Sequence, residues 1–144
     1  MSVQRFLGFD YGTKLIGVAV GGTALGEAQA LTTIVVNHGK PDWPRLDNLL
    51  KEWQPHGFVL GLPLNMDGTD TDATAPARKF GHQLQGRYNL PVHWVDERLS
   101  SVAAKAQLEE AGISPVGRNK AEVDKQAARL ILQNHLDQLP RQLS

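Results

Sequence analysis

Three strand-like segments precede every helical pattern in this chain, and they restrict the folds that it can adopt. The apolar run 6–9 ends at Asp10, and a second strand pattern covers 15–20 after a connection of four residues. A connection of that length suits a hairpin, so the two strands are expected to be antiparallel neighbours. A third strand, within 28–36, is rich in β-branched side chains. The chain therefore begins with a three-stranded meander.

Helices and strands alternate after Asp42, which is a good N-cap residue. The apolar side chains of residues 43–53 fall on one helical face. The later expected elements are strands 57–62 and 91–95 and helices of about 74–87, 101–112 and 119–138. With right-handed crossovers, this order gives one α/β domain over residues 1–144. Its mixed five-stranded sheet has the order 3-2-1-4-5, with helices on both faces.

Acidic residues lie where the parallel strands of this sheet end. Asp10 closes the first strand, the polar loop 63–69 follows the fourth, and Glu97 follows the fifth. The carboxyl ends of these strands meet at one edge, where open α/β sheets bind their ligands. Asp124, near the start of the last helix, lies beside the apolar stripe, where aspartate is rarely buried without a partner.

Each of these three acids also has an ordinary structural explanation. Asp10 could form an Asx turn, Glu97 could belong to a surface ion-pair cluster, and Asp124 could favour the helix dipole. Together, however, the carboxylates would repel by about 3 kcal/mol per pair at ~5 Å and an effective dielectric of about 20. A cation or a proton must then occupy the cluster. Oxygen ligands favour Mg²⁺ or Mn²⁺, so the pattern predicts one or two such ions in a phosphodiester-cleaving site.

Two polar segments are candidate substrate contacts. Gly12, Thr13 and Lys14 form a glycine turn with exposed N–H groups and a hydroxyl, which suits a phosphate. Asn65 and Asp67 could contact the substrate backbone, although an ordinary turn explains them equally well. Further candidate phosphate contacts, which could equally be plain solvated charges, are Lys14, Arg78, Lys79, Arg98, Arg118, Lys120 and Lys125.

Composition excludes several other classes of protein. The chain has no cysteine, which removes disulfides, thiolate zinc sites, iron–sulfur clusters and cysteine nucleophiles. Its 15 basic residues balance 15 acidic ones, so it is not a generally basic nucleic-acid binder. It has no apolar run of the ~18 residues that a membrane span needs, and its N-terminus has no signal-peptide pattern. A cytoplasmic protein that does not bind membranes is expected.

Four sequence blocks in order resemble the YqgF family, also called RuvX. They are GFDYGTK at 8–14 with the strand after it, GLPLNMDGT at 61–69, DERLSSVAA at 96–104, and a helical pattern built on Lys120, Val123, Asp124, Ala127 and Ala128. The resemblance covers nearly the whole chain and implies a ribonuclease H-like fold. It also implies a cytoplasmic nuclease that processes the 5′ end of pre-16S ribosomal RNA or resolves Holliday junctions.

The family's catalytic acids fall on Asp10, Glu97 and Asp124. The better-known junction resolvase of this fold looks as if it has two acids three residues apart on its last helix. Here the positions three residues from Asp124 are Ala121 and Ala127, so the resemblance implies a leaner metal site.

Other functions remain open at this point. A phosphotransferase of the actin and sugar-kinase type also begins with an Asp-x-Gly-Thr hairpin, but it needs two such domains. A non-catalytic module in ribosome assembly or transcription is a further alternative. The nucleic-acid partner could be precursor ribosomal RNA or branched DNA, and the chain could act as a monomer or a weak homodimer.

Overall fold

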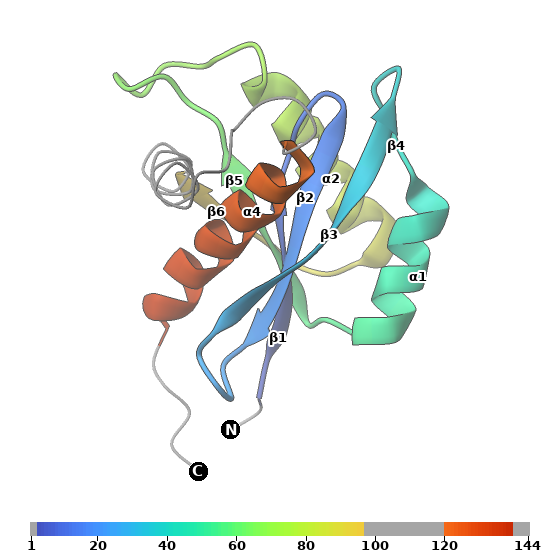
Figure 1. The fold of residues 1–144 in the computed structure, drawn as a ribbon, viewed down its shortest axis with the longest axis vertical. Helices are drawn as coiled ribbons and strands as arrows, with labels where there is room; N and C mark the ends of the chain where they lie inside the picture. Colours follow the sequence, from blue (N-terminus) through green and yellow to red (C-terminus); the bar gives the residue numbers. More distant parts are fainter. Residues whose placement is uncertain (1–2, 97–119, 140–144) are drawn as a thin grey trace.

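The computed structural model describes residues 3–96 and 120–139, which form a mixed sheet with helices on both faces (Figure 1). The strands are β1 (Arg5–Asp10), β2 (Leu15–Gly22), β3 (Ala28–Asn37), β4 (Lys40–Pro41), β5 (Gly57–Leu62) and β6 (Val92–Asp96). The helices are α1 (Trp43–Trp53), α2 (Thr74–Tyr88) and α4 (Lys120–Asp137). The helix expected at 101–112, together with Glu97 and Arg98, lies outside the described residues.

The sheet has the order β4-β3-β2-β1-β5-β6. The strand β1 pairs parallel with β5, which pairs parallel with β6, and the first four strands of the chain pair antiparallel. The predicted order 3-2-1-4-5 is therefore confirmed as β3-β2-β1-β5-β6.

The predicted count of five strands is wrong by one, because the two-residue strand β4 adds an edge. His38 and Gly39 have φ values of 51° and 76°, the positive φ at both central residues that a type I′ hairpin turn requires. This turn pairs Asn37 with Lys40 and Val36 with Pro41. Two residues are too few to show a strand pattern in the sequence.

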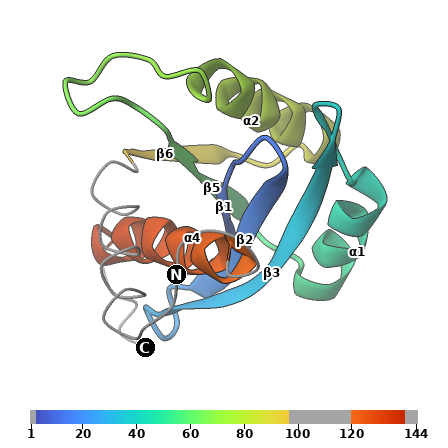
Figure 2. The same ribbon diagram turned by 45° about the horizontal axis from the view of Figure 1, so that its top comes forward.

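Apolar side chains alternate between the two faces of the sheet and form two cores. On β1, Leu7 and Phe9 pack on the side of α1 and α2, while Phe6 and Gly8 face α4. Figure 2 shows α4 on one side of the sheet and the other two helices on the opposite side. Asp10, the next residue on β1, therefore lies on the α4 side.

Glycines on this side let α4 approach the sheet backbone. A Cβ atom on Gly8 would lie 2.7 Å from the Cβ of Leu132, closer than real Cβ atoms come. A Cβ atom on Gly17 would overlap the backbone carbonyl of Asp124. The spacing between α4 and β2 thus depends on the missing side chain at Gly17.

The helices begin and end largely where the sequence predicts. The Asp42 side chain accepts a hydrogen bond from the Arg45 N–H, as expected of an N-cap. In α2, Thr74 is buried and its hydroxyl donates to the carbonyl of Pro63, which ties the start of the helix to the end of β5. Among the described residues, no helix has the length and apolar character needed to cross a bilayer.

Candidate active site

Asp10 and Asp124 come together through Gly17. Asp10 ends β1 and is the Cα partner of Gly17 on β2. Residues directly opposite in an antiparallel pair have Cα atoms about 4.5–5.5 Å apart. Because the Asp124 backbone packs against Gly17 on the face that Asp10 shares, both aspartates belong to one region at the carboxyl end of β1.

Asp124 is almost completely buried, with 7% of its surface exposed. Burial raises the pKa of its carboxyl group, and the charge and hydrogen bonds of Lys120 partly oppose this shift. The Lys120 Nζ atom lies 3.3 and 3.4 Å from the two carboxylate oxygens, one helical turn before Asp124. Lys120, predicted as a substrate contact, therefore neutralises a candidate catalytic acid in this structure.

The chemistry of these donors suits Mg²⁺ or Mn²⁺. Among residues 3–96 and 120–139 no group of three or more His, Asp or Glu side chains could hold a metal. Glu97, the third acid of the prediction, lies outside these residues. Mg²⁺ usually binds one or two carboxylates and completes its shell with water and substrate phosphate oxygens. Asp10 and Asp124 supply that number of carboxylates.

The hairpin between β1 and β2 carries the predicted phosphate turn. A Cβ atom on Gly12 would overlap the carbonyl oxygen of Leu15, so only glycine fits the turn. Thr13 and Lys14 are exposed at its tip, while the carbonyl of Lys14 accepts a hydrogen bond from Val36 at 2.9 Å. The turn is fixed to β3 and presents its side chains outward.

Asn65 and Asp67 have a structural role in the loop that follows β5. The Asp67 Oδ1 atom accepts hydrogen bonds from the N–H and hydroxyl of Thr69, at 3.0 and 2.6 Å. The Asn65 amide donates to the Thr69 hydroxyl at 3.0 Å and to the Asp70 carbonyl at 3.1 Å. These bonds close the loop internally, and Figure 2 shows it extending away from the sheet. Their predicted contact with substrate stays a prediction.

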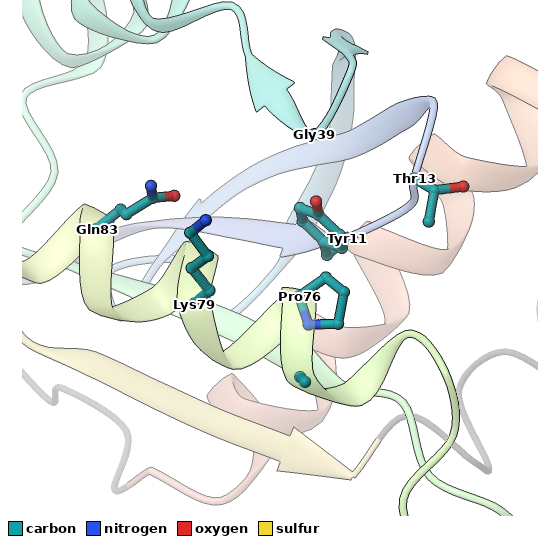
Figure 3. A pocket seen from close by; sticks show the side chains of 7 residues that line it. Tyr11, Thr13, Gly39, Pro76, Lys79 and Gln83 are labelled. Carbon is teal, nitrogen blue, oxygen red and sulfur yellow. The ribbon is translucent and has the colours of Figure 1, made fainter.

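A pocket on the opposite side of the hairpin was not predicted from the sequence. It has a volume of about 520 Å³ and is lined by Tyr11, Thr13, Gly39, Ala75, Pro76, Lys79 and Gln83 (Figure 3). Four of these residues occupy one face of α2, beside its apolar stripe. This second face of α2 is the sequence signal from which the α2 side of the pocket could have been predicted. Tyr11 and Gly39 join the pocket only through the fold.

Comparison with known proteins agrees with this arrangement. A family model described as "RuvX: Holliday junction resolvase" matches residues 4–138. A protein of Pseudomonas fluorescens named "Putative pre-16S rRNA nuclease" is 46% identical over 138 residues, which cover 96% of this chain and 95% of the relative. A protein of the same name from Aeromonas hydrophila is 49% identical over 96% of this chain and 98% of its own.

Solved structures show the same fold at low sequence identity. The RuvC protein of Thermus thermophilus, solved with a Holliday junction substrate, has a TM-score of 0.52 at 15% identity and covers 92% of this chain and 93% of its own. The yeast mitochondrial Holliday junction resolvase has a TM-score of 0.53 at 10% identity and covers 92% of this chain and 78% of its own. The fold is thus the ribonuclease H-like one, and by family match and sequence identity the chain belongs to the RuvX family.

Proposed function

We propose that this protein is a divalent-metal-dependent nuclease that hydrolyses phosphodiester bonds at the 5′ end of pre-16S ribosomal RNA. The observation that carries the proposal is the packing of Asp124 against Gly17, the strand partner of Asp10. This packing brings two acids from distant parts of the chain to one sheet edge. The names of the relatives supply the substrate, and a cytoplasmic location and a single domain over the whole chain belong to the same proposal.

In this proposal Asp10, Glu97 and Asp124 hold one or two Mg²⁺ or Mn²⁺ ions. A bound ion of this kind neutralises charge on the scissile phosphate and makes water more acidic. Asp10 and Asp124 orient the site from two rigid elements, a central strand and a packed helix. Gly12, Thr13 and Lys14 position a phosphate at the hairpin, and Arg98 contributes a further contact.

Lys120 has two successive partners in this proposal. Without metal, its ammonium group balances the buried carboxylate of Asp124 at 3.3 Å. Its side chain is half exposed and can turn outward when another cation takes its place. It then becomes available to a phosphate of the substrate, as the sequence predicts.

The proposal is tested by the Asp10→Asn variant in a cleavage assay with Mn²⁺ on a precursor of 16S ribosomal RNA. Wild-type protein should release the 5′ extension, and Asp10→Asn should lose at least about a hundredfold in rate, the equivalent of about 3 kcal/mol. The unfolding temperature of the variant should equal or exceed that of wild type, because one negative charge leaves an acidic cluster.

Asp72→Asn is the matched control, because Asp72 is exposed and lies outside the candidate site. It removes the same charge and should leave cleavage unchanged. Equal Mn²⁺-dependent cleavage by wild type and Asp10→Asn would contradict the proposal. Absence of cleavage, together with no metal binding at millimolar Mg²⁺ or Mn²⁺, would instead favour a non-catalytic module.

A Holliday junction resolvase is the second candidate function. The description of the matched family and the fold shared with the T. thermophilus protein favour it. A synthetic four-way junction in the same assay separates the two functions. Cleavage of a junction at paired positions requires a two-fold dimer, whereas trimming an RNA end requires one subunit. Measuring the molar mass of the active species in solution gives a second, independent criterion.

A further inference from the structure

We propose that the pocket beside Tyr11 binds one unpaired nucleotide of the substrate strand, next to the phosphate that lies at Asp10. The inference rests on the proposed nuclease function and deepens it. It assigns a binding site to residues of the β1–β2 connection, the β3–β4 turn and α2 that are not among the candidate acids (Figure 3).

The position of the pocket follows from the alternation of β1. Asp10 faces α4, whereas Tyr11, the first residue after β1, packs in the core on the α2 side with Phe9 and Phe80. The Cα atoms of Asp10 and Tyr11 are about 3.8 Å apart. Thr13 lines the pocket from the tip of the same hairpin. A nucleic-acid strand that crosses the end of β1 therefore meets the acids on one side of the hairpin and the pocket on the other.

The shape of the pocket suits a flat, largely apolar group. Its volume of about 520 Å³ lies within the ~300–1,000 Å³ range of small-molecule sites. The Tyr11 ring is held from behind by Phe80, with ring centroids 5.5 Å apart and planes inclined by 40°. In Figure 3 the Pro76 ring lies next to Tyr11. Tyr11 is buried overall, with 8% of its surface exposed, and it lines the pocket together with Pro76. The two side chains offer a small, rigid surface, and stacking of a base on an aromatic ring does not depend on which base is bound.

The polar groups of the pocket suit the rest of a nucleotide. Figure 3 shows the polar ends of Tyr11, Lys79 and Gln83 directed to the same side. Burial raises the pKa of the Tyr11 phenol, so at neutral pH the hydroxyl keeps its proton and can donate. The Gln83 amide can pair with a base edge, and the Lys79 ammonium with one phosphate. Among the residues that the structure describes, those that line the pocket include no carboxylate.

Charge around the mouth agrees with a phosphate-bearing ligand. Lys14 and Lys40 directly follow the lining residues Thr13 and Gly39, and both are exposed, as is Lys79. Within the part of the chain that the structure describes, these three lysines form no ion pair with an acid. A protein of zero net charge thus concentrates positive charge beside its candidate acids.

The test measures binding of a fluorescein-labelled single-stranded RNA octamer in EDTA, where metal cannot contribute. Ala75→Phe fills the pocket from an exposed helix position, and Lys79→Gln removes the cation. Ala75→Phe should weaken binding about tenfold, the size of the effect of one stacked base. Lys79→Gln should weaken it about threefold and lower the magnitude of the salt slope by about 0.7, the value for one phosphate contact with a single strand.

Two control variants introduce the same residues, phenylalanine and glutamine, at exposed sites outside the pocket. His82→Phe lies on α2, and Lys51→Gln lies in the last turn of α1. Both should bind the octamer as wild type does. Thermal unfolding of all four variants checks that they fold, and Lys79→Gln tests the pocket even if Ala75→Phe unfolds.

Each outcome separates the pocket from the nuclease function. If both pocket variants bind the octamer with the affinity and salt slope of wild type, the pocket assignment is overturned, even when Mn²⁺-dependent cleavage is normal. Failure of wild type to bind the octamer would also overturn it. Weaker binding by both variants supports it, even if wild type does not cleave RNA, a result that would contradict only the nuclease function. Equal affinity for AMP and for the octamer would show that a free nucleotide is the occupant and overturn the assignment to a strand.

Discussion

At the scale of single residues, the buried carboxyl of Asp124 opposes folding when it is ionised. Its pKa lies above the ordinary value of 3.8, because burial disfavours the charged carboxylate more than the ammonium group of Lys120 stabilises it. A group with a raised folded pKa contributes stability that is complete below 3.8 and is lost as pH rises through the folded pKa. At neutral pH the ionised side chain is therefore a source of instability, which a bound cation would relieve.

Asp124→Asn should consequently raise the unfolding temperature at pH 7 in the absence of metal, or at least leave it unchanged. The gain over wild type should be smaller at pH 4, where more of the wild-type carboxyl is protonated. Loss of the Lys120 ion pair subtracts little, because Lys120 is half exposed and such pairs are worth about 0–1 kcal/mol. An unfolding temperature several degrees below wild type at pH 7 would show that the ion pair outweighs the burial cost.

The partly buried ring of His135 should make folding stability depend on pH in the opposite direction. Its ring stacks on His93 with centroids 4.7 Å apart and meets the edge of Phe6 at 5.3 Å. Burial, with a smaller contribution from His93, lowers its pKa below 6.5. The unfolded chain therefore binds the proton more tightly than the folded protein does. The stability that neutral His135 contributes is complete above pH 6.5 and is lost as pH falls through the folded pKa.

Urea unfolding midpoints at pH 7.5 and 5.5 measure this effect. Wild type should lose stability at the lower pH, and His135→Phe should lose less, because phenylalanine cannot take up a proton. His82→Phe, at an exposed position, should keep the wild-type difference. The same loss in wild type and His135→Phe would contradict the assignment to His135.

At the scale of elements, the position of α4 depends on the glycines beneath it. Gly17→Ala would place a methyl group against the backbone carbonyl of Asp124, which cannot move without the helix. The substitution should destabilise the protein by about 1–3 kcal/mol, the usual cost of overpacking. It should also reduce cleavage, because it displaces Asp124 relative to Asp10.

Gly86→Ala provides the contrasting substitution on α2. Apart from the neighbouring backbone of α2, no atom of residues 3–96 and 120–139 lies within 4 Å of a Cβ placed there. Alanine should therefore stabilise the helix by about 0.5–1 kcal/mol. Chemical denaturation of both variants, together with their cleavage rates, tests the comparison. Equal stability changes at Gly17 and Gly86 would show that α4 does not depend on the close contact.

The elements that the sequence predicts well are those with long, regular patterns. Apolar spacing behind Asp42 predicts α1 with its N-cap, and the run 57–62 has the bounds of β5. The strand β4 escapes prediction because its two residues pair through turn geometry at His38 and Gly39 rather than through a pattern. Helix bounds at the C-terminal ends, such as Tyr88 rather than Arg87, differ by about one residue.

At the scale of the whole molecule, zero net charge predicts weak dependence of RNA binding on salt. If Lys14, Lys40 and Lys79 supply the phosphate contacts, the slope of log K against log salt should be about −2, at roughly 0.7 per contact. Fluorescence anisotropy with the RNA octamer, at salt concentrations from about 50 to about 300 mM, measures this slope. A slope steeper than about −5 would indicate a broad basic surface instead.

The candidate site divides into a predictable and an unpredictable part at this scale. The order of strands predicts that Asp10 and the loop after β5 lie at one edge of the sheet. Strand order does not place Asp124, which reaches this edge because α4 packs against Gly17. The ion pair of Lys120 with Asp124 follows from their spacing of four residues on one helix. The contact of Lys120 with substrate stays a prediction. The pocket could not be predicted, because its lining comes from the connection between β1 and β2, the turn before β4 and α2, and depends on how these segments pack.

The placement of Asp10 and Tyr11 on opposite sides of the sheet, at the end of β1, also has a pharmacological consequence. A compound that chelates the metal of a nuclease acts on the feature that all metal-dependent nucleases share. A compound seated between Tyr11, Pro76 and Lys79 would compete with the substrate strand without touching any metal. Its selectivity would then depend on Pro76, Lys79 and the other α2 side chains that line the pocket.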